Sequence, residues 1–133
     1  MNDEVFFDTN VLIYAIAKDD PRAVSAEAML AAGGVVSVQV LNEFVSVARR
    51  KLGMTWEEVA EALAAIRILC PAPVPITIET HETALRIAAK YGYQIYDALI
   101  AASALLAGCR RLFSEDLQDG QILEGRLTII NPF

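Results

Sequence analysis

The chain has 133 residues, of which 55% are hydrophobic and 21% charged, with a formal net charge of −6 at pH 7. This composition excludes a disordered chain, and the length fits one globular domain and is too short for two. The charge alone argues against a nucleic-acid partner, because phosphate backbones are bound by Lys and Arg. That objection weakens if four of the 17 acids bind a cation, since 13 acids against 11 basic residues leave −2.

The sequence indicates a protein that does not enter a membrane. No apolar run approaches the roughly 18 residues needed to span a bilayer, and the start Met1 to Glu4 is acidic where a signal peptide would be basic. We therefore expect a cytoplasmic protein. Cys70 and Cys109 match no metal or redox spacing and are expected to be reduced, structural thiols.

The first predicted element is a strand at Val5–Phe7, where three consecutive large apolar residues are typical of a strand buried on both faces. An acid, a hydroxyl and an amide follow at Asp8, Thr9 and Asn10, and the pattern then becomes helical, with Thr9 or Asn10 expected as the cap. In an open α/β sheet, ligands bind beyond the carboxyl ends of the strands, which places Asp8 for chemistry. The alternative is a capping or turn acid.

Further helices and strands alternate along the chain. Helices are predicted over 38–51, 55–69, 79–90 and 95–107 and from a start at Asp19-Asp20-Pro21 through Ala32, and short strands over 35–37, 76–78, 112–114 and 127–130. Short apolar strands that alternate with helices of this length indicate a parallel sheet wrapped by helices, which is an α/β fold. The stretch with Pro71, Pro73 and Pro75 is a stiff connector too short to divide domains.

Asp97 is the only charge between Lys90 and Arg110, and its neighbours along the predicted helix are apolar. A carboxylate in that setting is costly unless it is paired, binds a metal or lies at a helix N-terminus. The helix dipole alone favours an acid at the last of these positions, but an acid there does not need so apolar a neighbourhood, which makes Asp97 a candidate for chemistry.

Glu43 shares one face of the predicted helix 38–51 with Gln39, Ser46 and Arg50, a face that solvent alone would also explain. It lies in the first turns of a helix that directly follows a buried strand. Asp8 has the same geometry, because it also lies where a helix follows a buried strand. This placement makes Glu43 a second candidate acid.

Ser114, Asp116 and Asp119 follow the predicted strand 112–114, where a turn would also collect such residues. Glu115 and Asp119 are expected to be the more exposed members of this turn. Asp116 is therefore the preferred acid.

Together these acids form a pattern, because a parallel sheet would bring Asp8, Glu43, Asp97 and Asp116 to one edge. Four carboxylates cannot all stay ionised there without a counter-ion, since like charges raise each other's pKa. Oxygen ligands alone select a hard cation, Mg²⁺ or Mn²⁺, and the matching chemistry is hydrolysis of a phosphodiester.

At these residues the chain resembles the PIN-domain ribonucleases. The similar segments are Asp8–Asn10 after a strand, Glu43 in a helix, Tyr96–Ala102 and Ser114–Gly120. Within that family the chain is similar, from Val5 to Pro132, to the VapC-type toxins of VapBC toxin–antitoxin pairs. The resemblance implies a single PIN-like domain, a three-layer α/β/α sandwich with a central parallel sheet. It also implies Mg²⁺-dependent endoribonuclease activity, an RNA substrate, homodimerisation and inhibition by a small antitoxin protein.

The resemblance carries over a set of site residues by position. The acids are Asp8, Glu43, Asp97 and Asp116, and the supporting polar groups are Asn10 and Ser114. In this scheme Asp8 and Asp97 hold the principal ion, Glu43 helps to position the ion or its water, and Asp116 completes the cluster. Asp119 is an alternative or additional ligand to Asp116.

Other classes of protein stay open on the sequence. A phosphatase of the haloacid dehalogenase type also begins with a strand ending in Asp, but it uses a second acid two positions on, where this chain has Asn10. A phospho-acceptor receiver domain would have two adjacent acids after its first strand and a lysine after its last, and neither is present. A non-catalytic protein-interaction domain is the third alternative. The basic run Arg49–Lys51 suits either RNA or an antitoxin.

Overall fold

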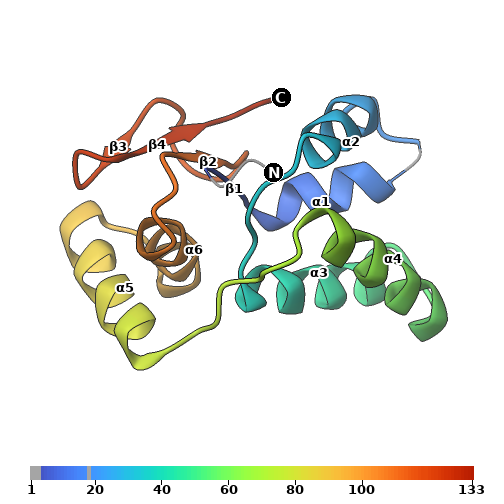
Figure 1. Ribbon diagram of the computed structural model, residues 1–133, viewed down its shortest axis with the longest axis horizontal. Coiled ribbons are helices and arrows are strands. Elements are labelled where there is room, and N and C mark those ends of the chain that lie inside the picture. The colour runs from blue at the N-terminus through green and yellow to red at the C-terminus, as the bar shows by residue number, and fades with distance from the viewer. Residues whose placement is uncertain (1–3, 18) are drawn as a thin grey trace.

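A computed structural model describes residues 4–17 and 19–133 of the chain. Over these residues the chain forms six helices and four strands (Figure 1). The strands are β1 (Val5–Phe7), β2 (Arg111–Phe113), β3 (Ile122–Leu123) and β4 (Leu127–Ile130). The helices are α1 (Thr9–Ile16), α2 (Ala23–Ala31), α3 (Val38–Arg50), α4 (Trp56–Leu69), α5 (Ile78–Tyr91) and α6 (Ile95–Leu106). The predicted α/β class is confirmed.

The sheet has the order β1-β2-β4-β3, in which β1, β2 and β4 are parallel and the short β3 is antiparallel to β4. Beyond β1 the ladder continues in single bridges, since the amide of Phe7 donates to the carbonyl of Val35 (2.9 Å) and that of Val38 to Val74 (2.9 Å). The residues that follow β1, β2 and this bridged segment therefore meet at one edge of the sheet.

The helices form two groups on either side of β1 and β2, with α5 and α6 in one group and α1 to α4 in the other (Figure 1). All three residues of β1 are buried, as expected for a strand covered on both faces. In α6 the side chains of Ala98 and of every residue from Ile100 to Leu105 are buried, so the prediction of a central buried helix is confirmed.

Several local predictions were wrong or incomplete. The strand expected over 76–78 is absent because Thr77 caps α5: its hydroxyl accepts from the Thr80 amide, the Thr80 hydroxyl accepts from the Thr77 amide, and Ile78 is exposed. The strand expected over 35–37 is reduced to single bridges, and β3 was not predicted. Asp8, rather than Thr9 or Asn10, caps α1.

Both cysteines are free and buried, and burial raises the pKa of the Cys70 thiol to about 11. Within residues 4–17 and 19–133, no helix has the length and apolar character needed to cross a bilayer. Met1 to Asp3, on which the expectation about a signal peptide depends, lie outside the described residues.

The backbone at Gly34 approaches β1 closely, which generates a stability prediction. A Cβ atom at Gly34 would lie 2.4 Å from Cε2 of Phe7 and 3.0 Å from the carbonyl oxygen of Val5. The Phe7 ring is fully buried and cannot move aside without repacking the core. We expect Gly34→Ala to lower the free energy of unfolding by about 1–3 kcal/mol, measured by urea denaturation.

The control for this prediction is the same substitution in a Phe7→Leu background, which removes the ring that the added methyl group meets. The cost of Gly34→Ala should then be smaller. An equal cost in both backgrounds would show that the ring contact is not its cause.

Candidate active site

Asp8 is a carboxylate buried at the end of β1, with only 4% of its surface exposed. One oxygen, Oδ1, accepts from the Thr9 amide (2.7 Å), and Oδ2 accepts from the Ser114 hydroxyl (2.8 Å). Burial, with smaller contributions from the charges of Asp116 and Glu43, raises the pKa of Asp8 to about 6 against the lowering effect of these two hydrogen bonds. Asp8 therefore holds its negative charge at a free-energy cost.

The register of the sheet places Ser114 beside Asp8. The parallel ladder continues one residue past the strands, since the Asp8 amide donates to the Phe113 carbonyl (3.0 Å) and the Ser114 amide to the Ile130 carbonyl (3.0 Å). Ser114 is completely buried, so its hydroxyl can serve only groups within the site. The structure places Ser114, which the resemblance implies as a supporting polar group, next to Asp8.

Glu43 joins this site through Thr9. The Thr9 hydroxyl donates to Glu43 Oε2 (2.8 Å), and the Gln39 side-chain amide donates to Oε1 (3.1 Å). Sequence reasoning gave neither Thr9 nor Gln39 a role in the site. The signal for Gln39 was its position four residues before Glu43 on the same helical face.

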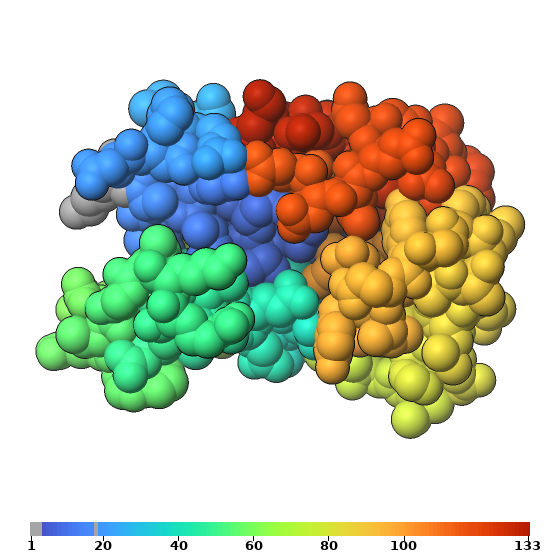
Figure 2. Space-filling model, turned by 180° about the vertical axis from the view of Figure 1, so that it is seen from behind, coloured from blue at the N-terminus to red at the C-terminus, as the bar shows by residue number. Residues whose placement is uncertain are grey.

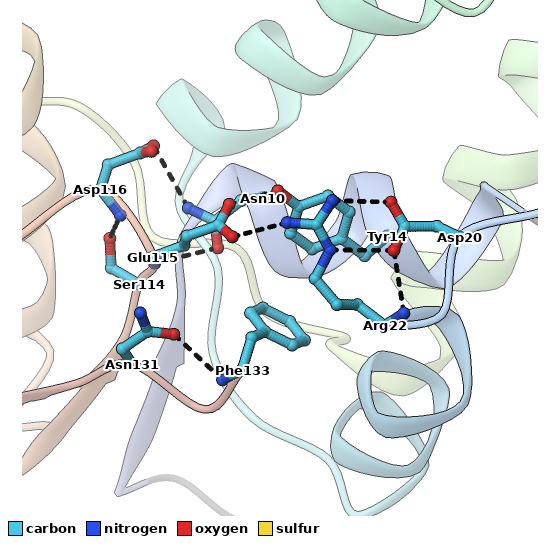
Figure 3. A network of polar contacts seen from close by, with 9 residues as sticks. All are labelled: Asn10, Tyr14, Asp20, Arg22, Ser114, Glu115, Asp116, Asn131 and Phe133. Atoms are coloured by element: carbon cyan, nitrogen blue, oxygen red, sulfur yellow. Dashed lines mark hydrogen bonds and ion pairs between the residues drawn. The ribbon is translucent and has the colours of Figure 1, made fainter.

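Asp116 is exposed and lies in the turn that follows β2. Its amide donates to the Ser114 hydroxyl (3.1 Å), and its Oδ2 accepts from the side-chain amide of Asn10 (3.3 Å). The Asn10 oxygen in turn accepts from the Glu115 amide (3.3 Å), so Asn10 fastens this turn to α1 (Figure 3). The structure thus brings Asp8, Glu43 and Asp116 together.

Glu115 is not the exposed turn residue that the sequence suggested, because it is half-buried in a network beside the acids (Figure 3). Its carboxylate accepts from the Tyr14 hydroxyl and pairs with the Arg22 guanidinium (2.7 Å). Arg22 also pairs with Asp20 (2.8 Å) and lies over the Tyr14 ring, 3.8 Å from its centroid. Sequence spacing carries no signal for this network, since Arg22 and Glu115 are 93 residues apart.

Asp97 lies half-buried in the first turn of α6, a helix that packs against α3 and β2. The pKa of Tyr93 is raised mainly by the burial of Tyr93 and, to a smaller extent, by the charge of Asp97. Among the described residues, no hydrogen bond or ion pair joins Asp97 to Asp8, Glu43 or Asp116. The structure therefore links three of the four predicted acids, through the hydrogen bonds of Thr9 and Ser114.

Asp119 is exposed, as expected, and its carboxylate accepts from the Asn131 amide (2.7 Å). This contact ties Asp119 to the chain after β4. Asp116, in contrast, contacts the groups that surround Asp8.

A cleft of about 510 Å³ opens beside these acids. In Figure 2, residues of α1 lie recessed between the orange segment that follows β2 and the green end of α3 with α4. The residues lining the cleft are Thr9, Asn10, Ile13, Tyr14, Glu43, Ser46, Val47, Arg50, Lys51, Glu115 and Asp116. The cleft therefore has acidic side chains at one end and basic side chains at the other.

The donor set of the site fits a hard cation in its chemistry. In the described part of the chain, no three His, Cys, Asp or Glu side chains are grouped closely enough to hold a metal ion among themselves. The side chains that converge on Asp8 nevertheless offer only oxygen, and their charges oppose one another, as the raised pKa of Asp8 shows. Oxygen ligands with unrelieved negative charge suit Mg²⁺ or Mn²⁺.

The fold and site define an α/β protein with carboxylates at the carboxyl edge of a parallel sheet, and solved structures of this class are similar to the chain. VapC20 of Mycobacterium tuberculosis, a toxin that cleaves the sarcin–ricin loop, has 23% sequence identity and a TM-score of 0.68, covering 84% of this chain and 91% of that one. A toxin–antitoxin complex from Klebsiella pneumoniae has 19% identity and a TM-score of 0.73, covering 97% and 98%. VapBC2 of Rickettsia felis, bound to a DNA fragment from its promoter, has 18% identity and a TM-score of 0.67, covering 96% and 98%.

The PIN domain family model matches residues 5–118, and the chain belongs to this family. The resemblance found in the sequence is thereby confirmed, with VapC toxins of VapBC pairs as structural neighbours. No curated protein sequence matches the chain.

The raised pKa of Asp8 generates a stability prediction. The folded pKa is about 6 and the ordinary value 3.8, so between these pH values the folded state keeps a proton that the unfolded chain has lost. The free energy of unfolding should therefore fall as the pH rises through this interval. Asp8→Asn should stabilise the protein in chelator by about 1–3 kcal/mol at pH 7 and much less near pH 4.

Denaturant unfolding at both pH values measures this difference. Asp19→Asn is the charge-matched control, because Asp19 is exposed, and it should change stability little at either pH. If Asp8→Asn lowers the free energy of unfolding equally at both pH values, the buried charge of Asp8 does not destabilise the folded protein.

Proposed function

We propose that this protein is a Mg²⁺- or Mn²⁺-dependent endoribonuclease and the toxin of a toxin–antitoxin pair. The observation that carries the proposal is Asp8, a buried carboxylate with a raised pKa and with Glu43 and Asp116 acting on it. It lies at the carboxyl edge of a parallel sheet in a chain of the PIN family. At a site of this kind, a bound divalent cation would offset the negative charge of the carboxylates.

The acids proposed to hold the ion are Asp8, Asp97 and Asp116, with Glu43 positioning the ion or its water. Such an ion supplies positive charge that activates water and offsets the charge of the scissile phosphate. The other polar groups keep the acids in place: Ser114 orients Asp8 and the Asp116 amide, and Thr9 orients Glu43. The network of Arg22 and Glu115 fixes the turn that carries Asp116.

Asp97 enters the proposal through its position. It matches the PIN-family acid that begins the helix corresponding to α6, and it is half-buried there in a largely apolar helix. Asp119 stays an alternative to Asp116, although its carboxylate accepts from the Asn131 amide and does not contribute to the raised pKa of Asp8.

The partners we propose are an RNA substrate, a small antitoxin protein and a second copy of the chain. The antitoxin is supported by the similarity to structures described as a toxin–antitoxin complex and as VapBC2. A phosphatase of the haloacid dehalogenase type has less support, because Asn10 replaces its second acid and uses its side chain to fasten the turn at Asp116.

Cleavage of RNA by the purified protein tests the proposal. We expect cleavage of defined structured and unstructured RNAs in Mg²⁺ or Mn²⁺ and none in chelator. Asp8→Asn and Asp97→Asn should each reduce the rate by roughly 100-fold or more, because each removes charge from the ion site. The rate should also rise between pH 5 and pH 7, since Asp8, with a pKa of about 6, binds a cation only after losing its proton.

Asp19→Asn is the control for these variants and should cleave at the wild-type rate. Binding of Mn²⁺ is measured as a rise in the melting temperature. If the protein neither cleaves RNA nor binds Mn²⁺, the proposal is rejected in favour of a non-catalytic interaction domain.

The choice between the two acids of the turn has its own test. Asp116→Asn should reduce the cleavage rate more than Asp119→Asn, because Asp116 acts on Asp8 whereas Asp119 binds the Asn131 amide. The melting temperature of each variant shows whether folding is intact. A larger loss in Asp119→Asn would reverse the assignment.

A further inference from the structure

We propose that Arg50 and Lys51 bind a phosphate of the RNA strand away from the phosphate that is cut. The inference rests on the proposed function, because it assigns the second end of the same cleft. Arg50 and Lys51 line this cleft together with Glu43 and Asp116, so acids and bases share one continuous surface.

The helix α3 sets the separation between the two ends. Glu43 and Arg50 lie seven residues apart on one helical face, which is two turns or roughly 10 Å at 1.5 Å per residue. Ser46 lies between them, one turn from each, and its hydroxyl accepts from Nε of Arg50 (3.0 Å). This contact lays the Arg50 side chain along the wall of the cleft and leaves its terminal N–H groups for a ligand.

Neither cation is neutralised by the described part of the protein. No ion pair among those residues involves Arg50 or Lys51, although the chain has an excess of acids. Two unpaired cations at the end of a cleft favour an anionic ligand.

The neighbouring Arg49 differs from Arg50 and Lys51, because its side chain makes contacts within the protein. Its guanidinium donates to the Met54 carbonyl (2.8 Å) and lies over the Trp56 ring, 4.4 Å from the centroid. Arg49 does not line the cleft and instead joins the end of α3 to the start of α4. The run Arg49–Lys51 thus divides into one structural residue and two residues available to a ligand.

A nucleic acid fits this cleft better than an acidic polypeptide does. A strand with repeated phosphates can place one phosphate at the cation held by the acids and another at Arg50 and Lys51. The cleft wall between the two ends includes Ile13, Tyr14 and Val47, and these side chains offer apolar surface that a base can contact. An acidic peptide would use the basic end alone and would be repelled by the acidic end.

Binding of RNA in chelator tests the inference without requiring cleavage. The probe is a fluorescent mixed-sequence single-stranded RNA, and its affinity is measured by anisotropy over a range of salt concentrations. The double variant Arg50→Gln/Lys51→Gln should bind roughly tenfold or more weakly at low salt. The slope of log affinity against log salt should fall by about 0.7, the change expected when one phosphate contact on a single strand is lost.

The matched control is Arg67→Gln/Arg126→Gln, which removes the same charge from exposed residues that do not line the cleft. It should keep the wild-type affinity and salt slope, and melting temperatures show that both double variants are folded. In the cleavage assay, Arg50→Gln/Lys51→Gln should raise KM more than it lowers kcat, because a phosphate contact away from the cut bond contributes uniform binding.

The outcomes separate this inference from the proposed function. Metal-dependent cleavage with unchanged RNA binding in Arg50→Gln/Lys51→Gln would overturn the inference and leave the ribonuclease in place. Wild-type binding that depends on Arg50 and Lys51, without any cleavage, would support the inference and reject the activity. A double variant that loses binding of polyglutamate and keeps binding of RNA would assign these residues to a protein partner and overturn the inference.

Discussion

The rest of the site depends on the burial of one carboxylate. Asp8 is 4% exposed, and its pKa of about 6 shows that desolvation outweighs the hydrogen bonds from Thr9 and Ser114. Glu43 and Asp116 add to the cost where neutral residues would reduce it. Such an arrangement is unfavourable for folding, and it makes sense where a bound ligand removes the cost. The unbound site therefore already favours a positively charged ligand.

Residues far apart in sequence build this site because the parallel sheet sets their register. Asp8 and Ser114 are 106 residues apart, yet the β1–β2 pairing leaves them adjacent at the strand ends. The same neighbourhood lets Asn10 reach Asp116 and lets Arg22 reach Glu115. The polar contacts are therefore consequences of an apolar core, whose buried strand and central helix hold the sheet edge in place.

The sequence predicts those parts of the fold and site that depend on local patterns. The buried strand Val5–Phe7 and the acid that ends it follow from three apolar residues and a change of chemistry. The strand expected at 76–78 failed because the pair Thr77 and Thr80 also forms a capping box, and the hydrogen bonds of that cap outweigh a short apolar run. Glu115 could not be placed, since its partner Arg22 comes from a distant segment.

The cleft also shows why the net charge was a poor guide to partners. A total of −6 describes the field far from the molecule, whereas a ligand in the cleft meets two unpaired cations at one end and a cluster of acids at the other. At physiological salt the Debye length is about 8 Å, so each end is screened from most charges elsewhere on the surface. In the proposed function, the acids repel a polyanion until a divalent cation binds them, and that cation then attracts it. Binding of RNA at the acidic end would thus be coupled to the metal, while binding at Arg50 and Lys51 would not.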